Sequence, residues 1–230
     1  VSMMRRNITL IPAAGVGARF GAGKPKQYVE INGKTVLQHT IEIFEQHSRI
    51  DLIAVILSPE DSVFQTALSE KVRVFRVGGA SRAETVRNGV SVLLEQGLAE
   101  VQDNILVHDA ARCCLPTEAL TRLLDEAGEN DEGGILAIPV ADTLKRSDGS
   151  HHIDETVARA GLWQAQTPQL FQTALLHRAL SVDDLSEITD EASAIEKLGI
   201  RPRLVQGDTR NLKLTLPQDE YIVRLLLKAV

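Results

Sequence analysis

NITLIPAAGVGARFG, residues 7–21, decides the fold class of this 230-residue chain. The first seven residues form an apolar run that is typical of a buried β-strand, and a loop rich in glycine follows. Ala13, Ala14 and Gly15 allow a ligand to approach the backbone closely. Successive backbone N–H groups in such a loop can form an anion-binding concavity. The segment therefore predicts a strand that leads into a phosphate-binding loop.

Beyond this segment, apolar runs of strand length alternate with segments of helical periodicity. The expected strands are 7–13, 52–58, 71–77, 104–110, 133–140 and 201–207. The expected helices are 34–47, 60–70, 82–97, 117–128, 169–180, 190–199 and 217–230. This alternation implies βαβ crossovers, so it predicts an α/β fold with a mostly parallel sheet that helices cover on both faces.

Ligands of such sheets bind at the carboxyl ends of the strands. This rule singles out three loops, which are 13–27, 78–85 and 109–115. All three contain glycines or charged residues, and we expect them to converge on one site.

The alternation is interrupted at 141–166, where polar and apolar residues alternate around the turn-rich centre SDGSHH. This pattern predicts two extended arms of a hairpin that projects from the sheet. A projecting hairpin cannot bury both of its faces alone, so we expect it to pack on another subunit.

Composition excludes several classes of protein. The net charge is −6, which argues against a protein whose main task is to coat nucleic acid. No apolar run approaches the roughly 20 residues of a membrane span. The two cysteines, Cys113 and Cys114, are adjacent and lack the spacing of metal ligands. We therefore expect a soluble cytoplasmic protein that partners neither nucleic acid nor membrane.

The opening loop matches neither of two familiar nucleotide-binding motifs. A Walker A loop would need glycine at Ala18 and serine or threonine at Pro25. The dinucleotide fingerprint fails because Gly15, Gly17 and Gly21 are spaced one residue too far. What remains is a small-residue loop with several cations, which is either a phosphate site or a flexible solvated loop.

Several motifs together resemble one family. PAAGVGARFG and PKQY are followed by GGASRAETVRNG, VHDAAR, ITDEASA and NLKLT in the order found in 2-C-methyl-D-erythritol 4-phosphate cytidylyltransferases. The resemblance covers about Leu10 to Leu216, nearly the whole chain. It implies a Rossmann-like fold, a single nucleotidyltransferase domain over 4–230, and a homodimer formed through the 141–166 arm. It also implies that the enzyme joins CTP and methylerythritol phosphate, releases pyrophosphate and requires Mg²⁺.

The resemblance assigns a nucleotide site and a set of catalytic cations. Arg19, Lys26 and Lys213 match the cations that act on the triphosphate, whereas Lys24 lies off the motif and is expected to be solvated. The implied nucleotide-binding residues are Pro12, Ala13, Ala14, Gly15, Gly17, Gly79, Arg82, Thr85, Asp109 and Ala110. Without the resemblance, Lys213 would pass for a surface lysine.

Asp109 follows a buried strand, and the resemblance implies that it binds Mg²⁺. Mg²⁺ prefers few protein carboxylates together with phosphate oxygens. The alternative is that Asp109 caps a helix or pairs with Arg112. His108 precedes it, but the attacking phosphate is already ionised and needs no base, so we interpret His108 as structural.

The acceptor site is implied to involve Thr143, Arg159 and Thr189, with Arg159 supplied by the neighbouring subunit. Thr189 has an alternative interpretation as a helix N-cap. Two positions depart from the family pattern. Ala80 stands where many members have an acidic residue, and Cys113 stands where many have proline. The first puts base or ribose binding in question, and the second concerns loop stiffness.

Two other functions stay open at this stage. A cytidylyltransferase for another polyol phosphate, such as ribitol 5-phosphate, would have almost the same CTP site. A non-catalytic nucleotide-binding module would have lost catalytic cations, but all of those named above are present.

Overall fold

The structure, a computed structural model, describes residues 4–15, 23–65 and 68–228. Its strands are β1 (Asn7–Ala13), β2 (Glu30–Ile31), β3 (Lys34–Thr35), β4 (Leu52–Leu57), β5 (Val72–Phe75), β6 (Asn104–Val107), β7 (Gly134–Pro139), β8 (Leu144–Ser147), β9 (Ile153–Val157), β10 (Trp163–Gln172) and β11 (Arg203–Gln206). Its helices are η1 (Lys26–Tyr28, a 3-10 turn), α1 (Val36–Glu45), α2 (Arg82–Glu95), α3 (Thr117–Ala127), α4 (Thr173–Leu180), α5 (Glu191–Glu196) and α6 (Asp219–Lys228).

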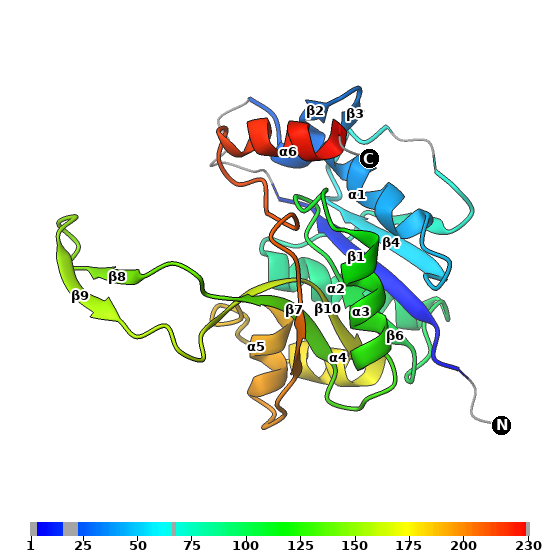
Figure 1. Ribbon diagram of the computed structural model, residues 1–230. Coiled ribbons are helices and arrows are strands. Elements are labelled where there is room, and N and C mark those ends of the chain that lie inside the picture. Colours follow the sequence, from blue (N-terminus) through cyan, green and yellow to red (C-terminus); the bar gives the residue numbers. More distant parts are fainter. Residues whose placement is uncertain (1–3, 16–22, 66–67, 229–230) are drawn as a thin grey trace.

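Seven strands form one sheet in the order β11-β7-β10-β6-β1-β4-β5. β1 pairs in parallel with β4 and β6, and the pairs β4–β5 and β7–β11 are also parallel. Only β10 runs antiparallel to its neighbours in this sheet. Helices α1 and α3 pack on one face, and α2, α4 and α5 pack on the other (Figure 1). The predicted α/β fold with a mostly parallel sheet is confirmed.

β4 shows why these apolar runs become inner strands. All six residues of LIAVIL are buried. Ile53, Val55 and Leu57 contact the core beneath α1 and α3, whereas Ala54 and Ile56 contact the core beneath α2 and α4. A strand covered on both faces is apolar throughout, because successive side chains point to opposite sides. Burial of each large side chain contributes roughly 1.5–3 kcal/mol.

The helix expected at 169–180 is wrong over its first turn. Residues up to Gln172 belong to β10, and α4 begins only at Thr173. Leu170 and Phe171 lie on opposite faces of the sheet, each in a different core cluster. A short apolar run is compatible with the period of a helix or of a strand. The backbone hydrogen bonds between β10 and β6 therefore decide that these residues form a strand.

The helix expected at 60–70 is also wrong for the described residues of that range, which form turns and irregular chain. The Asp61 carboxylate accepts hydrogen bonds from the backbone N–H groups of Val63 and Phe64. Such local bonds satisfy backbone donors that a helix would otherwise use. Asp61 also accepts a hydrogen bond from the Tyr28 hydroxyl, which ties this segment to η1.

The hairpin expected within 141–166 is confirmed. β8 and β9 pair antiparallel and extend as an arm well away from the sheet (Figure 1). Most of their residues are exposed, and Ile153 is 67% exposed. The second half of the predicted segment differs from expectation, because the chain from Trp163 onward already belongs to β10 in the sheet.

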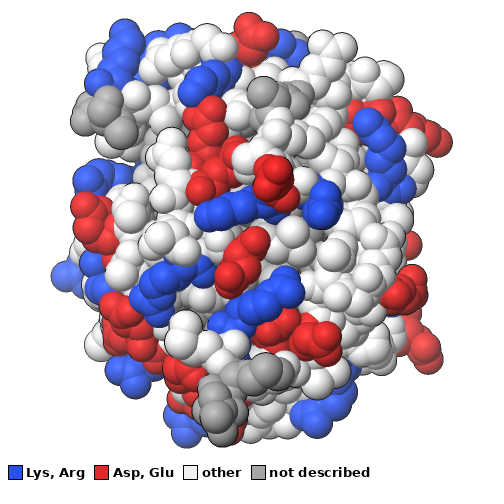
Figure 2. Space-filling model, turned by 90° about the vertical axis from the view of Figure 1, so that its right-hand side faces the viewer, with Lys and Arg blue, Asp and Glu red and all other residues white. Residues whose placement is uncertain are grey.

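The exterior is chemically mixed. On the face shown in Figure 2, the coloured side chains alternate between acidic and basic rather than gathering into a region of one sign. No helix in the described part of the chain is long and apolar enough to cross a bilayer.

Candidate functional site

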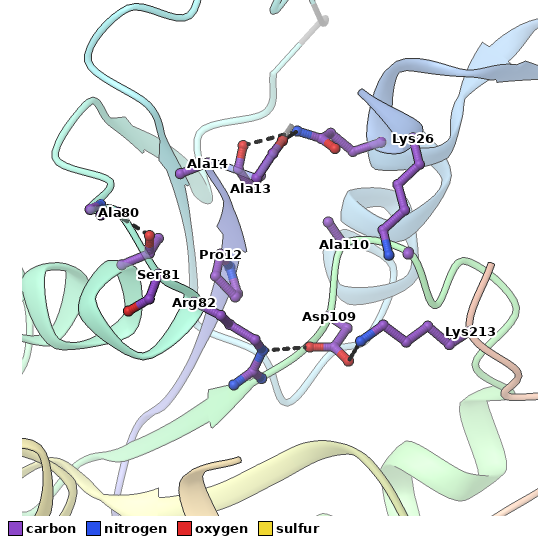
Figure 3. A pocket seen from close by; sticks show the side chains of 15 residues that line it. Pro12, Ala13, Ala14, Lys26, Ala80, Ser81, Arg82, Asp109, Ala110 and Lys213 are labelled. Carbon is purple, nitrogen blue, oxygen red and sulfur yellow. Dashed lines mark hydrogen bonds and ion pairs between the residues drawn. The ribbon is translucent and has the colours of Figure 1, made fainter. Parts of the chain in front are cut away.

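The three predicted loops converge at one edge of the sheet. The carboxyl ends of β1, β5 and β6 share that edge because these strands lie parallel. The loops after them surround a cavity of about 390 Å³ (Figure 3). Its lining residues are Pro12, Ala13, Ala14, Gly15, Lys26, Gln27, Gly79, Ala80, Ser81, Arg82, Thr85, Asp109, Ala110, Ala111 and Lys213. Of the predicted nucleotide and catalytic residues, only Gly17 and Arg19 are missing from this set, and both lie outside the described residues.

Gln27 fixes the start of the glycine-rich loop. Its side-chain Nε2 donates to the backbone oxygen of Ala13 at 3.2 Å and to that of Gly15 at 2.8 Å. The side chain is buried within η1, so the turn that presents Lys26 is bonded directly to the end of β1. In Figure 3 the Lys26 side chain extends from η1 into the cavity, toward Lys213.

Tyr28 anchors the other end of η1. Its hydroxyl donates to the Asp61 carboxylate, and burial together with this bond raises the Tyr28 pKa above its usual value. The phenol therefore stays neutral and keeps its proton in the bond. The two anchors, Gln27 and Tyr28, hold the backbone of Lys26 in place.

The loop before α2 requires glycine. A Cβ on Gly79 would lie 2.4 Å from Cγ of Glu84, too close for any larger residue without movement. The Gly79 N–H donates to the Thr85 hydroxyl at 3.0 Å, and the Ala80 N–H donates to Glu84 Oε2, also at 3.0 Å. Thr85 thus holds the loop. Glu84 brings a carboxylate to the backbone of Ala80.

Asp109 is the centre of a cluster of opposite charges. Its Oδ1 lies 2.9 Å from Arg82 Nε, and its Oδ2 lies 3.2 Å from Lys213 Nζ and 3.7 Å from Arg112 Nε. Burial opposes ionisation, but the three cations outweigh it and hold the Asp109 pKa well below its usual range. Asp109 is therefore an anion at neutral pH. The pairing with Arg112 that the sequence left as an alternative exists, as the longest of the three contacts.

His108 has structural contacts. Its Nδ1 lies 2.9 Å from the Thr167 hydroxyl, and its Nε2 lies 2.8 Å from the Arg112 backbone oxygen. The carbonyl oxygen can only accept, so Nε2 carries the proton of the neutral ring and Nδ1 accepts from the Thr167 hydroxyl. Thr167 Oγ1 in turn accepts from the Asp109 N–H at 3.1 Å. Burial lowers the His108 pKa to about 4. The neutral ring thus orients the backbone of Asp109.

A second, smaller cavity of about 220 Å³ adjoins the first. The two share Arg82, Asp109 and Lys213, and the second adds Thr189 and Arg112. The alternative role of Thr189 as an N-cap is wrong. Asp190 caps α5, accepting from the Ser193 N–H in a capping box.

The arm residues lie apart from both cavities in this chain. Thr143 precedes β8 and Arg159 follows β9, and both are exposed. Arg159 donates a hydrogen bond to the backbone oxygen of Ala141 across the base of the arm. Neither residue is among those that line the two cavities of its own chain.

Two residues that sequence reasoning left without a role belong to the site. Gln27 stands in the PKQY motif, and its place in that motif could have indicated a role in the site. Glu191 stands in TDEASA. It accepts two hydrogen bonds from Arg82, at 2.7 and 2.8 Å. No local pattern indicated this partner, because Arg82 lies far away in the sequence.

Comparisons with known proteins show the family of the chain. The profile of the family described as 2-C-methyl-D-erythritol 4-phosphate cytidylyltransferase matches residues 7–229. A protein of that name from Neisseria meningitidis serogroup A is 70% identical over 99% of this chain and 100% of its own length. Among solved structures, a 4-diphosphocytidyl-2C-methyl-D-erythritol synthase is 62% identical with a TM-score of 0.86, covering 98% of this chain and 100% of the other. The Francisella tularensis cytidylyltransferase is 32% identical with a TM-score of 0.81, covering 96% and 99%.

Proposed function

The chain belongs to the 2-C-methyl-D-erythritol 4-phosphate cytidylyltransferase family, and on this premise we propose how its two cavities carry out the reaction. CTP and 2-C-methyl-D-erythritol 4-phosphate give 4-diphosphocytidyl-2-C-methyl-D-erythritol and pyrophosphate. The observation that carries the proposal is the convergence of Lys26, Lys213, Arg82 and Asp109 on a cavity whose wall is small-residue backbone. Two polyanions must be held together there, and cations around an open backbone loop reduce their repulsion.

CTP occupies the larger cavity. Its triphosphate lies on the backbone of Ala13 to Gly15, with Lys26 on the phosphate oxygens. Arg19, to which the resemblance gives the same task, lies outside the described residues. The loop of Gly79 and Ala80, with Thr85 behind it, faces the base and ribose. The N–H groups of Gly79 and Ala80 are bonded to Thr85 and Glu84, so the backbone carbonyl groups of this loop would supply the contacts, without an acidic side chain at Ala80. The remaining wall is formed by Pro12 and Ala110. Gly17, the other expected nucleotide-binding residue, lies outside the described residues.

Asp109 is the residue that would hold Mg²⁺. The described residues contain no group of three or more His, Cys, Asp or Glu that could hold a metal ion by themselves. Mg²⁺ does not need such a group, because it binds through one or two carboxylates together with substrate phosphates. A carboxylate has about four lone-pair positions, and the contacts with Arg82, Lys213 and Arg112 leave capacity for a ligand bond. When bound, the ion neutralises charge on the phosphates.

The acceptor phosphate occupies the smaller cavity, beside Thr189 and Lys213. Because the arm extends away from its own sheet, we propose that Thr143 and Arg159 complete this site from the second subunit of a homodimer. The chemistry is an in-line attack by an acceptor phosphate oxygen on the α-phosphorus of CTP. A phosphate is ionised at neutral pH, so no general base is required, and His108 stays structural. We propose a cytoplasmic location, consistent with two free cysteines.

A shared site can be tested by subunit mixing. Lys26→Ala and Arg159→Ala homodimers should both be nearly inactive. In a heterodimer of the two, one site has an intact Lys26 and an intact Arg159, whereas the other site lacks both. The heterodimer should therefore show about half of the activity of the wild-type dimer. The measurement is activity of affinity-purified heterodimers carrying two tags. A heterodimer as inactive as its parents would contradict the sharing of Arg159 between subunits.

Replacing Gln27 by Ala should weaken CTP binding about tenfold, because two buried hydrogen bonds that fix the loop are lost. The measurement is the CTP dissociation constant from calorimetry. Gln38→Ala is the matched control, since its amide bonds to Glu42 on α1 rather than to the loop. Equal CTP affinity in the two variants would count against an anchoring role for Gln27.

The function itself is tested by pyrophosphate release from CTP and Mg²⁺ across a panel of polyol phosphates. We expect methylerythritol phosphate to be used with the highest kcat/KM. Release with ribitol 5-phosphate alone would move the assignment to that acceptor. CTP binding without release for any acceptor would indicate a non-catalytic module.

A further inference from the structure

Glu191 is a buried carboxylate that the proposed reaction leaves without a task. It is the first residue of α5, and its side chain is 2% exposed. A buried carboxylate is costly unless it is paired and hydrogen-bonded. Its partner is Arg82, which lines both cavities. The pair is therefore part of the wall of the site rather than a surface contact.

The geometry divides the Arg82 guanidinium between two carboxylates. Nη1 donates to Glu191 Oε2 at 2.7 Å, and Nη2 donates to Glu191 Oε1 at 2.8 Å. This is the parallel, bidentate arrangement that gives arginine–carboxylate pairs their fixed orientation. Only Nε is directed at Asp109, at 2.9 Å from Oδ1 (Figure 3). Glu191 thus determines which edge of Arg82 faces Asp109.

The charged groups around Asp109 also indicate that Glu191 determines the orientation of Arg82. Asp109 already contacts Lys213 and Arg112 through Oδ2. If the terminal nitrogens of Arg82 had no partner, they could turn to Asp109 and pair with both of its oxygens. That pairing would use the acceptor capacity that a divalent cation needs. Glu191 prevents it by holding both nitrogens and by offsetting the charge of Arg82.

We propose that Glu191 is a positioning residue that keeps the Asp109 carboxylate available to the divalent cation accompanying CTP. Glu191 itself touches neither substrate nor metal and acts only through Arg82. Partners of this kind typically change metal affinity about 10- to 100-fold when they are removed. The inference rests on the proposed function, since it assigns Asp109 to the metal.

The test compares CTP binding with and without metal, by calorimetry in the absence of acceptor. Mn²⁺ is the metal probe, and EDTA defines the metal-free state. For the wild type, Mn²⁺ should strengthen CTP binding. In Glu191→Gln this strengthening should fall about tenfold. Metal-free CTP should bind as well as before or more tightly, because the charge of Arg82 is no longer offset.

A positioning role therefore predicts a smaller Mn²⁺ effect without weaker metal-free binding of CTP. A loosened fold would instead weaken CTP binding both with Mn²⁺ and without metal. Glu191→Asp retains the charge with a shorter side chain, so it should lose less of the Mn²⁺ effect than Glu191→Gln. It also serves as the test if the glutamine variant does not fold. Glu187→Gln is the matched control, because Glu187 is 79% exposed and pairs with Lys197 at the surface.

Three results with the variants would overturn the proposal. They are an unchanged Mn²⁺ effect in Glu191→Gln, an equal loss of metal-free and Mn²⁺-dependent binding, and a larger loss of the Mn²⁺ effect in Glu191→Asp than in Glu191→Gln. A wild type that binds CTP equally with and without Mn²⁺ also overturns it. A wild type that does not bind CTP contradicts the proposed function instead, so the two failures are distinguishable.

Discussion

Lys26→Ala should lower kcat by about 10²- to 10³-fold while the CTP dissociation constant rises far less. Charge develops on the oxygens around the α-phosphorus as the acceptor attacks, and a fixed cation stabilises the transition state more than the ground state. Gln27 and Tyr28 hold the backbone of Lys26, so its side chain enters the cavity from a fixed point on η1. Single-turnover rates and equilibrium binding of CTP separate the two quantities.

Lys24→Ala is the control for this experiment. Lys24 has the same charge, lies two residues earlier and is exposed. Its removal should leave kcat within about twofold of the wild type, because an exposed charge is screened by solvent and salt. A weaker CTP affinity with an unchanged kcat in Lys26→Ala would show that Lys26 binds the ground state and the transition state equally well.

Asp109→Asn should reduce kcat/KM by about 10³-fold or more, the largest loss that we expect from a single substitution. The amide is neutral and is a weaker ligand for Mg²⁺ than a carboxylate. Arg82, Lys213 and Arg112 would also face no anion. The free energy of unfolding should fall by about 3 kcal/mol, because a buried ion cluster loses one partner. Steady-state kinetics and denaturant unfolding measure the two effects.

Asp131→Asn makes the same chemical change at the surface, where Asp131 is 90% exposed and pairs with Arg5. It should change neither activity nor the free energy of unfolding measurably. An Asp109→Asn enzyme with near wild-type kcat/KM at saturating Mg²⁺ would remove Asp109 from the role of metal ligand.

Features with a local cause could be predicted from the sequence. The strand at 7–13 and the loop after it follow from an apolar run and small residues, and both the sheet and the convergence of three loops follow from parallel strand order. The prediction is wrong for the described residues of 60–70 because local side-chain bonds take the place of a helix, and for 169–172 because a long-range strand pairing decides the structure. Asp61 bonds its own neighbours and Tyr28, and β10 pairs with β6.

The site was predictable to the extent that motifs marked single residues. Lys26, Asp109 and Lys213 line one cavity as expected. The pair of Arg82 and Glu191 could not be predicted from local pattern, because its partners come from α2 and α5 and meet only in the folded chain. The sequence also could not show that Asp190, rather than Thr189, caps α5, since both are good capping residues.

Cytidylyl transfer is tested most directly by following phosphorus labels from CTP. With methylerythritol phosphate as acceptor, label at the α-phosphate should appear in the cytidine-containing product, and label at the β- and γ-phosphates should appear together in pyrophosphate. Release of the γ-label as inorganic phosphate, or recovery of the α-label only in CMP, would contradict the account.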